Sequence, residues 1–176
     1  MSTLTPRHIL LSRSVSAILL AINWANRIPA SVLGLVVRVG VAYVFWRSGQ
    51  TKVSGWHVTD SAIQLFRDEY KVPLIPPELA ANLAAAQEHL FSVLLVVGLA
   101  SRVSALGLLA MTAVIEIFVY PQSWPDHLLW AGSLLYVIAR GPGALSLDAL
   151  ICRFFPWGQC TTSIVGDSRK PSVTPH

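Results

Sequence analysis

The sequence is short of charge. Only 12% of its 176 residues are Asp, Glu, Lys or Arg, whereas about 25% of the residues in a typical soluble domain are charged. Hydrophobic residues make up 53% of the chain, and its mean hydropathy is +0.57. The net charge of +4 does not indicate nucleic-acid binding in so apolar a chain, because in a membrane protein such an excess more often marks the cytoplasmic loops. We therefore expect an integral membrane protein.

Cysteine is also scarce. The chain contains Cys152 and Cys160, seven residues lie between them, and there is no CxxC motif. A membrane thiol–disulfide oxidoreductase needs paired thiols close to its redox partner, so this pattern weighs against that class. No spacing typical of a zinc or haem site occurs either. We predict no catalytic residues, no metal ligands and no cofactor bound by a ligand set of the chain itself.

Long apolar runs are present, and four of them are candidates for membrane-spanning helices, which need about 20 residues each. They cover residues 31–52, 78–99, 103–120 and 126–140, and the last is short for a span. Residues 8–27 place apolar side chains at helical spacing, which predicts a helix lying flat in the membrane interface. The expected fold is all-α: an integral membrane four-helix bundle with an N-terminal interfacial amphipathic helix.

Three parts follow from these elements. Residues 1–30 form a cytoplasmic N-terminus that contains the interfacial helix, and residues 31–151 form the four-span membrane domain. Within that domain, Ser146 is placed to cap a short amphipathic helix over residues 147–155. Residues 152–176 form a cytoplasmic tail that is rich in Pro, Ser and Thr, and we expect it to be disordered.

The orientation is predicted from the distribution of Lys and Arg. Four spans put both termini on the same side as the connection at Arg102, and that side carries eight basic residues against four on the other. The positive-inside rule then places both termini in the cytoplasm and residues 48–77 outside. Because thiols stay reduced in the cytoplasm, both cysteines are expected to be free.

Four charged residues fall inside the apolar runs. Such charges are costly, about 2.5–3.5 kcal/mol for an Arg at a helix centre, so they usually face partners. Counting 1.5 Å per residue from the ends of the spans puts Arg47 and Glu116 at one depth, and Arg38 and Glu88 at another. We therefore predict two buried ion pairs, Arg47–Glu116 and Arg38–Glu88. A purely architectural role for these pairs stays open.

A polar pocket is predicted at the outward end of the bundle. Glu116 and Tyr120 share one helical face, and Trp124 and His127 follow after a short turn. Together with Arg47 they form the predicted ligand pocket. Taken individually, the aromatic residues are more typical of the belt at a membrane interface than of ligand contacts, and that alternative is left open.

Five segments carry distinctive motifs: RVGVAYVFWRSGQTKVSGW (38–56), FRDEYKVPLIPPELAA (66–81), GLASRVSALGLLAMT (98–112), IFVYPQSWPDHLLWA (117–131) and RGPGALSLDAL (140–150). In these segments the chain resembles the DoxX family of small bacterial four-helix membrane proteins, in particular a branch encoded beside bufferin-type metal-stress proteins. The resemblance implies a multi-pass protein of the bacterial inner membrane. In the family a Gln is usual at the position of Glu116, which favours a polar contact over a catalytic carboxylate there.

The resemblance leaves three classes of function. The first is an accessory membrane protein of a stress or metal-handling system, acting through a membrane or periplasmic protein partner or through a small outward-facing polar pocket. The second is a membrane subunit of a quinone-linked redox enzyme, since other relatives are associated with a thiosulfate:quinone oxidoreductase. The third is a small transporter, although no inverted repeat is visible. The isolated chain is not expected to be an enzyme.

Overall fold

A computed structural model of the chain describes residues 6–154, so the predicted tail lies outside the described residues except for its first three positions. The elements in chain order are α1 (Pro6–Ala25), α2 (Ala30–Gln50), β1 (Val53–Ser54), β2 (His57–Val58), α3 (Asp60–Leu65), the π-helical turn η1 (Phe66–Tyr70), α4 (Pro77–Val97), α5 (Ser101–Val114), the π-helical turn η2 (Ile115–Val119), the 3₁₀ turn η3 (Pro121–Ser123), α6 (Trp124–Arg140) and α7 (Leu147–Phe154).

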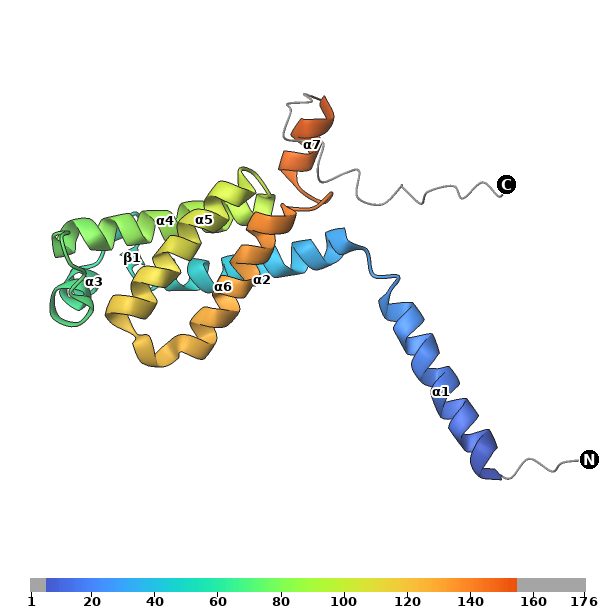
Figure 1. Cartoon of the computed structure of the whole chain (residues 1–176). Helices are drawn as coiled ribbons and strands as arrows, with labels where there is room; N and C mark the ends of the chain where they lie inside the picture. Colours follow the sequence, from blue (N-terminus) through green and yellow to red (C-terminus); the bar gives the residue numbers. More distant parts are fainter. Residues whose placement is uncertain (1–5, 155–176) are drawn as a thin grey trace, which may run out of the picture.

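Four helices form a bundle. α2 contacts both α4 and α6, and α5 contacts the same two helices (Figure 1). Each helix contributes one to three apolar side chains to the buried core: Val41, Ala42 and Phe45 from α2, Leu95 from α4, Ala105 and Leu108 from α5, and Leu134 and Val137 from α6. Most other apolar side chains of these helices are exposed on the outside of the bundle. This arrangement suits a lipid surround and confirms the predicted all-α membrane bundle.

Three helices are long and apolar enough to cross a membrane: Ala30–Gln50, Pro77–Val97 and Ser101–Val119, the last formed by α5 together with η2. The fourth predicted span is α6, which has 17 residues and is therefore about 25 Å long, somewhat less than the thickness of a bilayer core. It packs against α2 and α5 as the fourth member of the bundle.

The N-terminal helix α1 extends away from the bundle (Figure 1). Val15, Ile18, Leu20 and Trp24 are all more than half exposed. At 100° per residue these side chains point to several sides of the helix, so its second half is apolar around much of its circumference. Its contact surface is therefore apolar, as expected for a segment that lies among lipids.

A small cap between α2 and α4 was not predicted. β1 and β2 form a two-stranded hairpin, and Thr59 then starts α3 by accepting a hydrogen bond from the Ala62 amide. Phe66 of η1 packs against Ala80 and Ala81 in the first turns of α4. The beginning of α4 therefore packs against the cap. We name this end of the bundle the cap end and the opposite end the α7 end.

At the α7 end, α4 stops at Gly98, whose φ of +78° is in the left-handed region that glycine adopts without steric cost. The amides of Gly98 and Leu99 both donate to the carbonyl of Leu94, which closes the helix in the usual way. α7 begins and ends within one residue of the predicted helix. It stands beyond the ends of α4 and α6 (Figure 1).

Cys152 lies in α7 and is disulfide-bonded, so the expectation of a free thiol there is wrong. Its bonding partner is not among the described residues. The expectation depended on a cytoplasmic location, and that location depended on the count of basic residues alone. Disulfides persist mainly in oxidising compartments, so the Cys152 disulfide opposes the orientation predicted from the basic residues, and accessibility labelling of the two ends of the bundle decides between them.

Candidate functional site

The two π-helical turns lie next to each other at the cap end. η1 carries Glu69 and Tyr70, and η2 carries Glu116 and ends at Tyr120. The Tyr120 hydroxyl donates to Glu69 Oε1 at 2.6 Å, and the rings of Tyr70 and Tyr120 pack edge to face with centroids 5.6 Å apart. π-Helical turns occur frequently at functional sites. The contact between the two π-helical turns therefore marks a candidate functional site.

Glu116 and His127 form an acid–imidazole pair. His127 Nδ1 lies 2.5 Å from Glu116 Oε2. Because a carboxylate only accepts hydrogen bonds, we assign the proton to Nδ1 of His127. The His127 side chain is 6% exposed and that of Glu116 is 33% exposed, so the pair is buried at the imidazole and reaches the surface at the carboxylate.

Aromatic rings fix the imidazole from the bundle side. The ring of His127 packs on Trp130 with centroids 4.9 Å apart, and Trp130 packs edge to face on Phe45 of α2. Pro125 occupies the first turn of α6, a position where its fixed φ suits a helix start. The chain reverses direction between η2 and α6. His127 therefore faces Glu116, which precedes it by only eleven residues.

The predicted pairing of Arg47 with Glu116 is not what the structure shows, since Glu116 pairs with His127. Arg47 is exposed and makes no ion pair within residues 6–154. The buried face of α2 carries Arg38, Ala42, Phe45 and Gly49, and Arg47 lies about 160° from Gly49 around the helix. The prediction considered only depth along the helix and not the direction in which Arg47 faces.

The predicted pairing of Arg38 with Glu88 is also corrected. Glu88 accepts two hydrogen bonds of 2.9 Å from Lys52 Nζ and one of 2.9 Å from Ser48 Oγ. Counting depth from Pro77 misplaced Glu88, because the first turns of α4 pack against the cap. Glu88 therefore lies level with the end of α2 and not in the middle of the bundle.

Arg38 lies at the α7 end and is fully buried. Its Nη2 donates to the Leu145 carbonyl at 2.7 Å, and this carbonyl belongs to the loop between α6 and α7. The Nε and Nη1 atoms have no protein partner among the described residues. The two predicted pairs are thus replaced by three separate contacts: Glu116–His127, Glu88–Lys52 and Arg38–Leu145.

Two tyrosines of the site are held in the protonated form. The hydrogen bond to Glu69 raises the pKa of Tyr120 above its ordinary value, and burial raises the pKa of Tyr70. Both hydroxyls therefore stay protonated at neutral pH. Tyr70, Glu69 and Lys52 were missed from the sequence, although the motif FRDEY that contains two of them was among those that carried the family resemblance.

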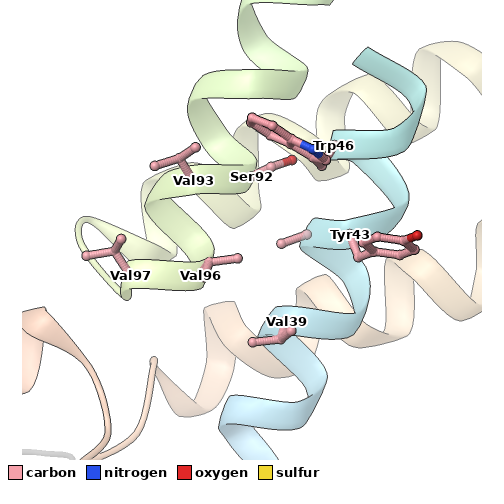
Figure 2. Close-up of a pocket in the computed structure, with 8 residues that line it drawn as sticks. Val39, Tyr43, Trp46, Ser92, Val93, Val96 and Val97 are labelled. Atoms are coloured by element: carbon pink, nitrogen blue, oxygen red, sulfur yellow. The ribbon is translucent and has the colours of Figure 1, made fainter. Parts of the chain in front are cut away.

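The two aromatic residues of the predicted pocket are exposed. Tyr120 is 39% exposed and Trp124 is 59% exposed. Two grooves elsewhere are more concave: one of about 320 Å³ between α2 and α4 (Figure 2), and one of about 520 Å³ between α2 and α6. Neither includes any of the five predicted residues. Ligand binding by these residues stays a prediction.

The groove between α2 and α4 is almost entirely apolar. Its walls are Val39, Ala42, Tyr43 and Trp46 on one side and Ser92, Val93, Val96 and Val97 on the other. In Figure 2 the side chain of Ser92 points toward α2 and Trp46. Its Oγ is buried and has no protein partner among the described residues, which is unusual because buried polar atoms are generally hydrogen-bonded.

No group of three or more His, Cys, Asp and Glu side chains within the part of the chain that the structure describes could hold a metal ion. The Glu116–His127 pair supplies an acid–base and hydrogen-bonding group at the site. Together the two side chains can accept or donate one proton, and they can hydrogen-bond a polar group at the surface.

Comparison with known proteins places the chain in a family. The model of the DoxX family matches residues 33–121, which include α2, the cap, α4, α5 and η2. The chain belongs to the DoxX family. It is also similar to a protein of Haemophilus influenzae described as an uncharacterized protein, with 30% identity over 141 residues that cover 73% of this chain and 89% of that protein. No solved structure matches the chain.

Membership of the family and the three spanning helices identify a helical membrane protein in contact with the lipid bilayer. Of the two titratable groups that form the Glu116–His127 pair, Glu116 lies inside the matched range and His127 lies beyond it. The site thus combines the family domain with the start of the helix that follows it.

Proposed function

We propose that this DoxX protein is an inner-membrane accessory protein of a stress or metal-handling system, and that it acts through protein contacts at its cap end. One observation carries the proposal: Glu116 of the Glu116–His127 pair reaches the surface, the exposed Tyr120 and Trp124 lie about one helical turn along the chain from these two residues, and none of the four lines either groove. Exposed aromatic residues around a few polar groups are typical of protein interfaces.

The proposed action needs the cap end to face outward, where a periplasmic or membrane partner can reach it. A cysteine introduced at Ser54, which is exposed in β1, should react with a membrane-impermeant maleimide in intact cells. A cysteine at Leu145, which is 51% exposed at the other end, should react only after lysis. The unaltered chain measures the background. The reverse pattern would contradict the orientation.

A site-specific photo-crosslinker tests the partner contact. Placed at Trp124, it should give a discrete crosslinked product in cells. Placed at Leu135, which is 52% exposed on the same helix nearer the α7 end, it should give none, because that position faces lipid. The variants are expressed from a plasmid in a strain that lacks the chromosomal gene. There His127→Ala should abolish both the crosslinked product at Trp124 and the stress resistance that the unaltered plasmid copy restores, while the amount of protein in the membrane stays unchanged.

Glu116→Gln is the matched variant, since its amide oxygen can still accept from His127 Nδ1, and it should keep both signals. Gln122→Ala, an exposed change in η3, controls for surface alteration. Identical products at Trp124 and Leu135, or full resistance in the His127→Ala strain, would rule the proposal out.

A membrane subunit of a quinone-linked redox enzyme is the second candidate, and the groove of Figure 2 favours it. Tyr43 and Trp46 offer aromatic faces to a planar ring. The chain would supply binding and orientation, and the quinone the redox chemistry. Quinone at one equivalent or more in an organic extract of the purified protein would favour this candidate.

A further inference from the structure

The apolar stripe of α7 is exposed. Leu147, Leu150, Ile151 and Phe154 recur at the spacing of one helical face, and no residue of α7 is buried. Leu150 is 50% exposed, Ile151 is 41% exposed and Phe154 is 70% exposed. A helix that packed on the bundle through its apolar face would hide these side chains. α7 instead presents them outward.

The polar side of α7 attaches the helix to the bundle. The Asp148 carboxylate accepts from the amides of Ala100 and Ser101 at 2.8 and 2.9 Å, and the Asp148 amide donates to the Gly98 carbonyl at 2.8 Å. The carboxylate thereby satisfies the first free amides of α5. These three bonds fix which way α7 faces, so the exposure of its stripe is set by the fold.

The attachment extends into the loop that precedes α7. Ser146 Oγ accepts from the Ala149 amide and caps the helix, and Leu145 is held by the buried Arg38. Only residues 141–146 separate α7 from the end of α6. Because α6 is a member of the membrane bundle, α7 begins where the bundle meets the membrane surface.

Positive charge surrounds α7. Arg102 comes directly after Ala100 and Ser101, whose amides donate to Asp148. Arg140 is the last residue of α6, and Arg153 lies on α7 itself. All three are exposed and none makes an ion pair within the described residues. The nearest acidic group, Asp148, is already engaged by the amides of α5. The surface beside the apolar stripe is therefore basic and has no protein partner in residues 6–154.

We propose that α7 and these three arginines form a binding surface for the anionic lipids of the leaflet at the α7 end. The stripe enters the boundary between headgroups and acyl chains, and the arginines contact lipid phosphates. An exposed apolar stripe bordered by basic residues is the composition that binds such a surface. This inference is independent of the function proposed for the cap end.

Hydrogen–deuterium exchange of the whole protein in lipid nanodiscs tests the proposal. We expect the amides of residues 147–154 to exchange roughly tenfold more slowly in phosphatidylcholine containing phosphatidylglycerol than in phosphatidylcholine alone. Arg153→Gln combined with Arg140→Gln should remove this difference. Leu150→Ser should speed exchange in both lipids, whereas Ala149→Ser, off the stripe, should change neither.

Amide exchange in the four-helix bundle shows for every variant whether the protein is folded. If Leu150→Ser misfolds, the milder Ile151→Thr is used in its place. Equal exchange of residues 147–154 in both nanodiscs would overturn the preference for anionic lipid. Exchange as fast in nanodiscs as in an unstructured peptide would show that lipid does not cover α7, and it would overturn the proposal.

Discussion

Lys52→Met is expected to destabilise the protein by about 3–5 kcal/mol, because it leaves Glu88 as a buried carboxylate without a counter-ion. The side chains of Lys52 and Glu88 are only 7% and 2% exposed. Lys52 Nζ donates to both oxygens of Glu88 and to Ser48 Oγ, each at 2.9 Å. The contact joins the end of α2 to the middle of α4, so its loss should loosen the cap end.

The same helix offers a matched control. Arg67 and Glu78 also form an ion pair, but their side chains are 55% and 54% exposed. Arg67→Met should therefore cost only about 0–1 kcal/mol. Unfolding of both variants in increasing SDS measures the two costs in one assay.

A double variant separates charge burial from packing. Glu88→Met alone should cost about as much as Lys52→Met, and the two together should cost clearly less than their sum, because no buried charge is then left unpaired. Strictly additive costs would show that the pair does not act as a unit. Equal costs for Lys52→Met and Arg67→Met would show that burial of the pair does not matter.

The helices of this protein could be predicted from its sequence because their ends are marked by strong local signals. Pro76 precedes α4 and Pro77 begins it, Gly98 ends it, Pro121 follows the helical run of α5 and η2, and Gly141 ends α6. Each signal acts through the backbone of the residue itself. Long apolar runs between such signals predict membrane helices whatever their neighbours are, which is why three of the four spans were predicted within a few residues.

The partners of the charged residues could not be predicted in the same way. The depth estimate assumed that each helix begins at the membrane surface, but α4 begins beside the cap. It also assumed that a charged side chain meets another charged side chain. Arg38 instead donates to the carbonyl of Leu145, and a backbone carbonyl has no signature in a sequence.

The contact between Glu116 and His127 was within reach of the sequence. The five residues between the third and fourth predicted spans, 121–125, include Pro121 and Pro125, which favour a tight return. Two residues that face each other across such a return are natural partners. The predicted pocket contained both residues, but Glu116 was paired with Arg47 because the two had the same estimated depth.

The second large effect is expected at Gly98, where α4 ends. Gly98→Ala should destabilise the protein by about 2–5 kcal/mol, the sum of a left-handed backbone cost and an overpacking cost. Its φ is +78°, and an added Cβ would lie 2.2 Å from Arg38 Nη1 and 2.6 Å from the Cβ of Ser146. Neither neighbour can move freely, since Arg38 is fully buried and bonded to Leu145, and Ser146 caps α7.

Gly55→Ala separates the two costs. Gly55 has a φ of +62°, and nothing lies within 4 Å of the Cβ position there, so this variant should lose only about 1–2 kcal/mol from the left-handed backbone. Unfolding in SDS compares the two stabilities, and faster amide exchange of residues 147–154 in Gly98→Ala alone would show that the added methyl group displaces the α6–α7 loop. If both variants lost the same stability and α7 exchanged normally, the close packing of Arg38, Gly98 and Ser146 would not be what holds the α7 end together.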